Sequence, residues 1–272
     1  MRFYHLIIAL LALSACESAV TNVTPPQVDP ELVVYSFISP EADSILVEVR
    51  MTTPVFVGGD LNNDRVNDAT VVLRSTAAAV TLPYTQNGRY VIHKSLFPLF
   101  PGTTYTLEVS TPRGHTARAI TQIPAANPAI DSVEEYSVPV GFGNFVTMNR
   151  VFWQDSPIEN NFYRIMSRIV QPGSFGDTSY YIVDNSLSTD EGKNGQQLSG
   201  SVEFYSFEED SVTSTRDILL LTTDQPYYKY HVKRLNYTGD NPFEEPLPMY
   251  DNIDGGTGCF SSYRLSRYKI GF

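Results

Sequence analysis

The feature that most constrains this chain is the recurrence of apolar residues at every second position, in short stretches separated by turn residues. In residues 44–51, for example, Ile45, Val47 and Val49 occupy alternate positions. Side chains of a β-strand point alternately to its two faces, so this spacing predicts a strand with one buried face. The first half of the chain shows similar patterns at residues 32–38, 70–74, 88–92, 104–109 and 115–123.

The composition agrees with a sheet-rich globular protein. The 272 residues include 17 Tyr and 15 Phe, and 42% are hydrophobic against 18% charged. Aromatic and β-branched residues are enriched in strands, and this balance of apolar and charged residues can form a packed core. Short strands joined by Pro/Gly turns therefore predict an immunoglobulin-like antiparallel β-sandwich over residues 31–124.

A second β-rich domain is expected over residues 125–272, after a proline-bearing boundary. Asp224 is a good N-cap and Pro226 suits the first turn, so one short helix is predicted at about residues 225–237. A polar, glycine-bearing insertion is expected at residues 171–200. Strands are predicted in this half at residues 130–138, 149–154, 161–170, 179–183, 201–207, 217–222 and 263–272. The predicted fold class is all-β and mainly antiparallel.

The first fifteen residues have the pattern of an export signal. Met1-Arg2 gives a positive start, and the apolar run at residues 6–13 is shorter than the ~20 residues of a membrane span. Leu13-Ser14-Ala15-Cys16 follows and resembles the lipobox of bacterial lipoproteins. We therefore expect residues 1–15 to be removed and Cys16 to carry the lipid.

The residues around this cysteine indicate where the lipid anchors the protein. Glu17 follows Cys16, so the aspartate that retains some lipoproteins in the inner membrane is missing. We expect an outer-membrane location, on either the periplasmic or the cell-surface face. Residues 16–30 contain three prolines and little apolar periodicity, which is typical of a tether between lipid and fold.

The formal net charge of −11 argues against nucleic acid as a partner. Proteins that bind nucleic acid need clustered Lys and Arg around the phosphates, and the sequence has no such cluster. The chain has two cysteines. If Cys16 carries a lipid on its sulfur, the two cannot form a disulfide, and Cys259 is predicted to be a buried free thiol.

The C-terminal part carries residues that connect this chain to a known family. A Tyr-rich helical segment precedes Asn-Pro-Phe at residues 241–243 and a glycine-rich stretch at 250–260. Together with the lipobox and the segments at 68–71 and 100–107, these motifs resemble the Bacteroidota lipoprotein family "domain of unknown function 4249". The resemblance covers nearly the whole mature chain. It implies a protein without an assigned activity, whose relatives are commonly neighbours of TonB-dependent outer-membrane transporters.

The sequence contains no evident catalytic or cofactor-binding pattern. His93, His115 and His231 lack a His or Cys partner at metal spacing, and no nucleophile elbow or phosphate loop occurs. We therefore predict a protein that is not an enzyme and has no cofactor. A hydrolase with paired carboxylates stays open, because such pairs meet only in the fold.

One stretch has oxygen ligands at alternate positions, as a calcium loop does: Asp60, Asn62, Asp64 and Asp68. Arg65 stands where the sharp turn of such a loop needs glycine, and no closing Glu follows. An Asn/Asp-rich hairpin turn is the simpler interpretation, so the prediction is that no metal is bound.

Three tripeptides match the O-glycosylation sequon of exported Bacteroidota proteins, with Ser44, Ser132 and Ser211 as the candidate acceptors. Motifs this short recur by chance, so one real site among the three is a reasonable expectation.

Recognition is expected in long loops that the rigid strands present. The segments at 171–200 and 239–258 qualify, and the second contains Phe243, Met249 and Tyr250. Aromatic residues and Met are enriched at protein interfaces, so these three residues are predicted to contact a partner or ligand. The alternative is that Phe243 and Tyr250 pack onto the core of the second domain.

Taken together, these patterns predict an outer-membrane, non-catalytic accessory or binding component that works with a TonB-dependent transporter in nutrient uptake. A cell-surface structural or adhesive lipoprotein is the alternative, and a glycan or peptide hydrolase is a third class. A small-molecule ligand is not readable from the sequence, because aromatic residues form cores more often than binding platforms.

Overall fold

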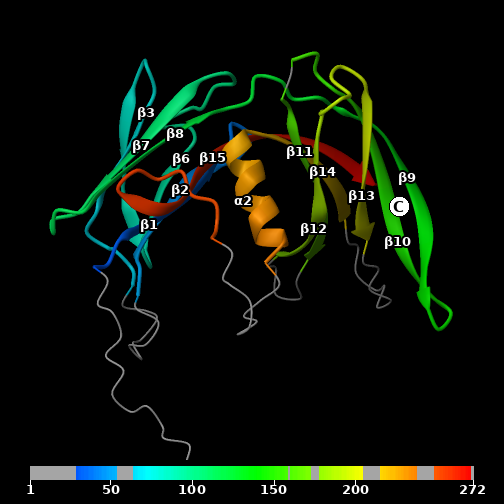
Figure 1. Cartoon of the computed structure of the whole chain (residues 1–272), viewed down its shortest axis with the longest axis horizontal. Coiled ribbons are helices and arrows are strands. Elements are labelled where there is room, and N and C mark those ends of the chain that lie inside the picture. Colours follow the sequence, from blue (N-terminus) through cyan, green and yellow to red (C-terminus); the bar gives the residue numbers. More distant parts are fainter. Residues whose placement is uncertain are drawn as a thin grey trace, which may run out of the picture.

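The strands of the computed structural model form an arch, with one helix beneath it (Figure 1). The structure describes residues 29–53, 64–158, 160–172, 178–204, 215–237 and 248–270. The first half of the chain contributes β1 (Leu32–Ile38), β2 (Ser44–Met51), β3 (Thr70–Arg74), β4 (Ala79–Leu82), β5 (Tyr84–Gln86), β6 (Arg89–His93), β7 (Thr104–Ser110) and β8 (Thr116–Gln122). The second half contributes β9 (Ile130–Gly141), β10 (Asn144–Gln154), β11 (Phe162–Pro172), β12 (Thr178–Thr189), β13 (Gln197–Phe204), β14 (Thr215–Thr223), helix α2 (Gln225–Leu235) and β15 (Gly256–Ile270).

An eight-stranded sheet runs through the whole molecule in the order β12-β11-β14-β15-β1-β2-β6-β5. Strand β15 lies near its centre and changes partners along its length. Its first part pairs parallel with β1 up to Ser262, and its second part pairs antiparallel with β14 from Tyr263 onward. The last described strand therefore joins both halves of the chain in one sheet.

Two smaller sheets pack on this large sheet, each over its own apolar core. The four-stranded sheet β4-β3-β7-β8 shares with the large sheet a core that includes Val47, Leu107 and Phe260. The three-stranded sheet β13-β10-β9 shares a second core that includes Trp153 and Leu220. Burying apolar side chains between two sheet faces is the main force that holds each half together.

Helix α2 covers the other face of the large sheet, beneath the arch in Figure 1. In β14, Leu220 belongs to the second core, whereas its neighbours Leu219 and Leu221 cluster with Tyr227 of the helix. Successive residues of a strand point to opposite faces, so these contacts place α2 opposite the three-stranded sheet. Leu265 of β15 also packs against this helix cluster.

The predicted fold class is confirmed, since the strands are mainly antiparallel and the described part of the chain contains one short α-helix at the predicted place. The polar, glycine-bearing insertion predicted at residues 171–200 is shorter than expected: the strand predicted at 179–183 extends as β12 to Thr189, β13 begins at Gln197, and residues 190–196 form the turn between them. Strand β12 is an edge strand of the large sheet, and an edge strand tolerates the polar residues that suggested a loop.

The division at residue 124 stays a prediction, and the structure adds one fact that bears on it. Ile253 and Phe260, from the end of the chain, belong to the core of the first half. The first half therefore completes its core with residues from the second half of the chain. No helix among the described residues is long and apolar enough to cross a membrane.

Candidate functional site

The candidate site lies where helix α2 begins, at the junction of the two halves. Asp224 directly follows β14 and is the N-cap of α2, and its carboxylate accepts the backbone N–H of Tyr227 at 2.9 Å. The first turn of a helix leaves N–H groups without helical partners, and an Asp side chain satisfies one of them. The sequence predicted this cap.

The second oxygen of the same carboxylate reaches the two sheets. Asp224 Oδ2 accepts a hydrogen bond from the Thr121 hydroxyl on β8 and one from the Ser262 backbone N–H on β15, the latter at 3.1 Å. The Ser262 hydroxyl in turn donates to the carbonyl oxygen of Gln122 at 2.9 Å. One carboxylate thus connects the helix, the large sheet and the four-stranded sheet.

Burial raises the pKa of Asp224 from 3.8 to about 6, because an ionised carboxylate loses its hydration there. The hydrogen bonds from Thr121, Tyr227 and Ser262 act in the opposite direction and limit the rise. Asp224 therefore changes charge close to neutral pH. A carboxyl group with such a pKa is a candidate acid or base, but both of its oxygens are engaged by protein donors.

A cavity of about 800 Å³ opens beside this carboxyl group. Its wall combines the end of β8, the linker to β9, the residues before β11 and the start of α2. The lining residues include Ile120, Gln122, Ile158, Asn161, Phe162 and Gln225. Ligand pockets in proteins span roughly 300–1,000 Å³, so the cavity is large enough for a small molecule or a segment of another chain.

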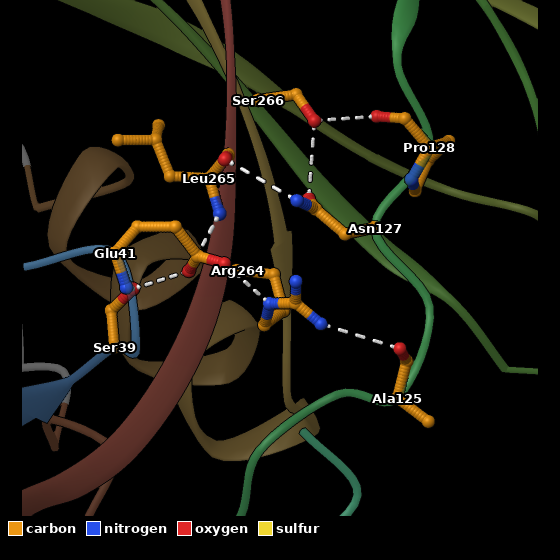
Figure 2. A network of polar contacts seen from close by, with 8 residues as sticks. All are labelled: Ser39, Glu41, Ala125, Asn127, Pro128, Arg264, Leu265 and Ser266. Atoms are coloured by element: carbon orange, nitrogen blue, oxygen red, sulfur yellow. Dashed lines mark hydrogen bonds and ion pairs between the residues drawn. The ribbon is translucent and has the colours of Figure 1, made fainter. Parts of the chain in front are cut away.

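A polar network holds the linker that forms one wall of the cavity (Figure 2). Asn127 donates a side-chain hydrogen bond to the carbonyl oxygen of Leu265 at 3.3 Å. The hydroxyl of Ser266 lies 3.2 Å from Asn127 Oδ1 and 2.8 Å from the carbonyl oxygen of Pro128. The linker between the halves is therefore fastened to β15 by its own polar groups.

A cluster of aromatic rings fills the space between α2 and the sheet. Phe37 of β1 contacts Tyr227, Tyr230 and His231 with ring centroids 5.5–5.6 Å apart. Burial, together with the positive charges of Arg164 and Arg234, lowers the pKa of His231 from 6.5 to about 3. A neutral, buried imidazole packs as a ring of this core, so the cluster holds the helix in place.

The predicted calcium ligands are only partly described. Asp60 and Asn62 lie outside the described residues, and Asp68 is exposed. Asp64 Oδ2 lies 3.2 Å from Arg50 Nη1 and forms an ion pair with it. Among the described residues, no group of three or more His, Cys, Asp or Glu side chains could hold a metal ion.

Of the predicted contact residues, Tyr250 lies beside helix α2. Met249 is 40% exposed, and the ring of Tyr250 is half-buried with Lys229 Nζ 5.9 Å from its centroid. Phe243 lies outside the described residues, as does the lipidation candidate Cys16. The contact role of these side chains therefore stays a prediction.

The modification candidates are distributed over separate elements. Ser44 is exposed at the start of β2 and Ser132 is exposed in β9, whereas Ser211 lies outside the described residues. Exposure is what a glycosyltransferase requires of its acceptor, and use of either serine stays a prediction. Cys259 is fully buried and free, as the sequence suggested.

The sequence predicted the cap at Asp224 but not its partners. Thr121 and Ser262 are 103 and 38 residues away from Asp224 along the chain, and each looks like an ordinary strand residue. No local signal marks them, because their role depends on how three elements meet. The cavity was missed for the same reason.

Comparison with known proteins gives a family but no activity. A family model described as "Domain of unknown function (DUF4249)" matches residues 19–269, so the resemblance seen in the sequence is confirmed. No curated protein matches the chain. Among solved structures, a two fibronectin type-III domain segment from chicken tenascin is similar at 11% identity, covering 71% of this chain and 91% of that chain, with a TM-score of 0.22. At that score the likeness carries no argument, and the architecture rests on the strand pairing described above.

Proposed function

The chain belongs to the family called domain of unknown function 4249, and on that premise we propose that it is an outer-membrane lipoprotein that serves nutrient uptake as a non-catalytic accessory or binding component. A lipid on Cys16 holds it at the membrane, and its partner is a TonB-dependent transporter. The lipobox at residues 13–16 supports the anchor. The partner is supported by what the family resemblance implies.

One observation carries the non-catalytic part of the proposal. Among the described residues on the wall of the junction cavity, Asp224 is the acidic one, and its two oxygens already accept hydrogen bonds from Tyr227, Ser262 and Thr121. General acid–base catalysis needs an oxygen that faces the substrate. This carboxyl group instead fixes the walls of the cavity, which is what a binding site requires.

The chemistry of the cavity wall favours an uncharged, partly apolar occupant. Ile120 and Ile158 are 49% and 58% exposed at the cavity, and Phe162 adds an aromatic ring to its wall. The side-chain amide nitrogens of Gln122 and Asn161 donate to protein groups, so these side chains contribute amide oxygens, which are hydrogen-bond acceptors, to the wall. An apolar surface with a few polar groups is the usual composition of a recognition site, so we place the contact with a transporter loop here.

The anchor is tested by Cys16→Ala. The variant should lose labelling with a radioactive or clickable fatty acid, and an alkaline carbonate wash should release it from the membrane fraction while the lipid-bearing wild type stays. Retention of the unlabelled variant after that wash, or labelling equal to that of the wild type, would contradict the anchoring part of the proposal.

The partner is tested by affinity purification from detergent-solubilised outer membranes. The wild-type chain should retain a TonB-dependent transporter, and the double variant Ile120→Asp, Ile158→Asp should lose it. Leu96→Asp is the matched control, because Leu96 is 72% exposed and is not on the cavity wall. Since all three positions are exposed, the thermal midpoint should change little in either variant.

The same experiment distinguishes the other assignments. If the wild-type chain retains no transporter while other outer-membrane complexes survive, the accessory role is wrong. Retention of the transporter by the Ile120→Asp, Ile158→Asp variant, with loss in Phe243→Ala, Tyr250→Ala at an unchanged midpoint, would move the contact to the 239–258 segment. Activity on a glycan or peptide panel would favour the hydrolase.

A further inference from the structure

The hairpin formed by β9 and β10 carries apolar side chains that are unusually exposed. Phe142 is fully exposed at its turn, Phe145 is 67% exposed, and Val140 is 56% exposed. Among the described residues, β13 pairs with β10 only as far as Thr147, so the tip extends beyond the three-stranded sheet. Figure 1 shows it projecting from one end of the arch.

The tip is also free of charge. Residues 136–149 contain no Asp, Glu, Lys or Arg, in a chain whose net charge is −11. Charged groups return at the base of the hairpin, at Glu135 of β9 and at Arg150 of β10. In the pairing of the two strands, Glu135 is opposite Asn149 and Arg150 is opposite Glu134. Arg150 lies over the ring of Tyr136 at 5.1 Å, and the Tyr136 hydroxyl bonds to Ser201. An uncharged tip therefore ends at a polar base that is fixed to the sheet.

Apolar side chains occupy both faces of this tip. Val138 is opposite Val146, and Phe145 is opposite Pro139, so the two pairs lie on opposite faces of the hairpin. A protein groove covers one face of a strand and its edge, and the other face would stay in water. A lipid bilayer surrounds an inserted tip on all sides, so the arrangement fits lipid better than a protein surface.

The position of the tip agrees with a membrane on that side. In Figure 1 the described chain begins at one foot of the arch and the hairpin forms the other foot, so both lie on the same side. Thirteen residues run from Cys16 to the residue before Asp29 inclusive, and they can span at most about 45 Å. The proposed lipid and the hairpin can therefore reach one bilayer together.

We propose that the β9–β10 tip, with Val140, Phe142 and Phe145, inserts into the facing leaflet of a lipid bilayer as a second attachment point. The tip dips into the interface of the membrane, while its polar base stays in the headgroup region. This orients the arch and keeps its concave side facing the membrane. The geometry uses the proposed lipid anchor, but the insertion itself is a property of the hairpin.

The test uses the mature chain, residues 16–272, with Cys16→Ser so that no lipid is attached. This chain should float with uncharged vesicles of phosphatidylcholine and phosphatidylethanolamine in a density gradient. The double variant Phe142→Ser, Phe145→Ser should lower the vesicle partition coefficient about tenfold or more, because two aromatic side chains no longer enter lipid. The double variant Leu96→Ser, Phe100→Ser is the matched control, since these residues are 72% and 58% exposed elsewhere.

A fluorescence readout is independent of flotation. Trp153 is the single tryptophan and is fully buried, so it gives a constant background. A tryptophan introduced by Phe142→Trp should shift its emission to shorter wavelength when vesicles are added, and brominated lipid should quench it.

The proposal is overturned if the Cys16→Ser chain stays with the soluble fraction, or if the hairpin variant floats like the wild type. It is also overturned if the hairpin variant loses a co-purifying protein while vesicle binding is unchanged, because the tip would then be a protein contact. Lipid labelling of Cys16 is measured separately, so failure of the anchor and failure of the hairpin are distinguishable.

Discussion

Arg264 Nε donates a hydrogen bond to Glu41 Oε1 at 2.7 Å and joins β15 to the loop between β1 and β2 (Figure 2). The other oxygen of Glu41 accepts the Leu265 backbone N–H at 3.3 Å and the Ser39 hydroxyl at 2.9 Å. Strand β15 leaves β1 after Ser262 and pairs with β14 from the next residue. Glu41 thus holds the shared strand directly after it passes from one half of the molecule to the other.

Replacing Glu41 with Ala should therefore weaken the connection between the halves. The Arg264 and Glu41 side chains are only 16% and 24% exposed, and the variant leaves the guanidinium and the Leu265 N–H without this acceptor. We expect the free energy of unfolding to fall by about 1–3 kcal/mol in urea titration. Asp43→Ala is the control, because its ion pair with Lys94 is on the surface and its loss should leave the midpoint unchanged. Equal effects of the two variants would contradict this role.

The pairing of β1 with β15 depends on glycine. At Gly258 the backbone has φ +126°, and a Cβ atom would lie 2.1 Å from the carbonyl oxygen of Val34. Gly258→Ala should lower the free energy of unfolding by about 3 kcal/mol or more, because the strands must separate or the backbone must distort.

Gly192→Ala is the matched control for that variant. Gly192 also has a positive φ, of +72°, but no atom lies within 4 Å of the position of its Cβ. Its cost should be limited to about 1 kcal/mol of backbone strain. Thermal or urea unfolding measures both variants, and a similar loss in both would show that the contact with Val34 is unimportant.

The glycines at the start of β15 also explain why the beginning of this strand was not predicted. The last strand was predicted to begin at residue 263, whereas β15 begins at Gly256. Gly255, Gly256 and Gly258 together have the appearance of a turn, which conceals the start of the strand. Gly255 does occupy a positive φ at the start, but Gly256 and Gly258 lie within the strand, where β1 approaches too closely for a side chain.

Sequence patterns predict the elements whose structure depends mainly on neighbouring residues. The alternation in β2 and the cap at Asp224 predicted a strand and a helix that the structure contains. Strands β4 and β5 were missed, because they have four and three residues and mostly exposed side chains. The bonds from Glu41 to Arg264 join residues 223 positions apart, and a pattern confined to neighbouring residues carries no record of them.

The buried imidazole of His231 should make the protein sensitive to acid. Its pKa is lowered from 6.5 to about 3, chiefly by burial. Between these two values the unfolded chain binds a proton that the folded protein does not, so the free energy of unfolding falls as pH decreases from about 6.5.

His231→Phe removes the titratable imidazole and keeps a ring in the aromatic cluster. The variant should therefore lose less stability than the wild type between pH 7.5 and pH 5, as measured by urea unfolding at both values. His93→Phe is a control, because His93 is an exposed histidine. An unchanged pH dependence in His231→Phe would mean that the ring is accessible to protons in the folded state.

The carboxyl group of Asp224 should produce the opposite pH dependence. Its folded pKa is raised to about 6 by burial against an ordinary value of 3.8, so the folded protein binds the proton first as pH falls. Its contribution to stability is therefore fully present below about pH 3.8 and is lost as pH rises through about 6.

Asp224→Asn cannot titrate but can still cap α2 through its amide oxygen. The wild type should gain roughly 1 kcal/mol over this variant on going from pH 8 to pH 5. Asp224→Ala should lower the free energy of unfolding by about 2 kcal/mol at pH 8 and about 3 kcal/mol at pH 5, because it leaves the N–H groups of Tyr227 and Ser262 without their acceptor and also cannot titrate. If the difference between wild type and Asp224→Asn is the same at pH 8 and pH 5, Asp224 does not titrate in this range, and burial does not control its charge.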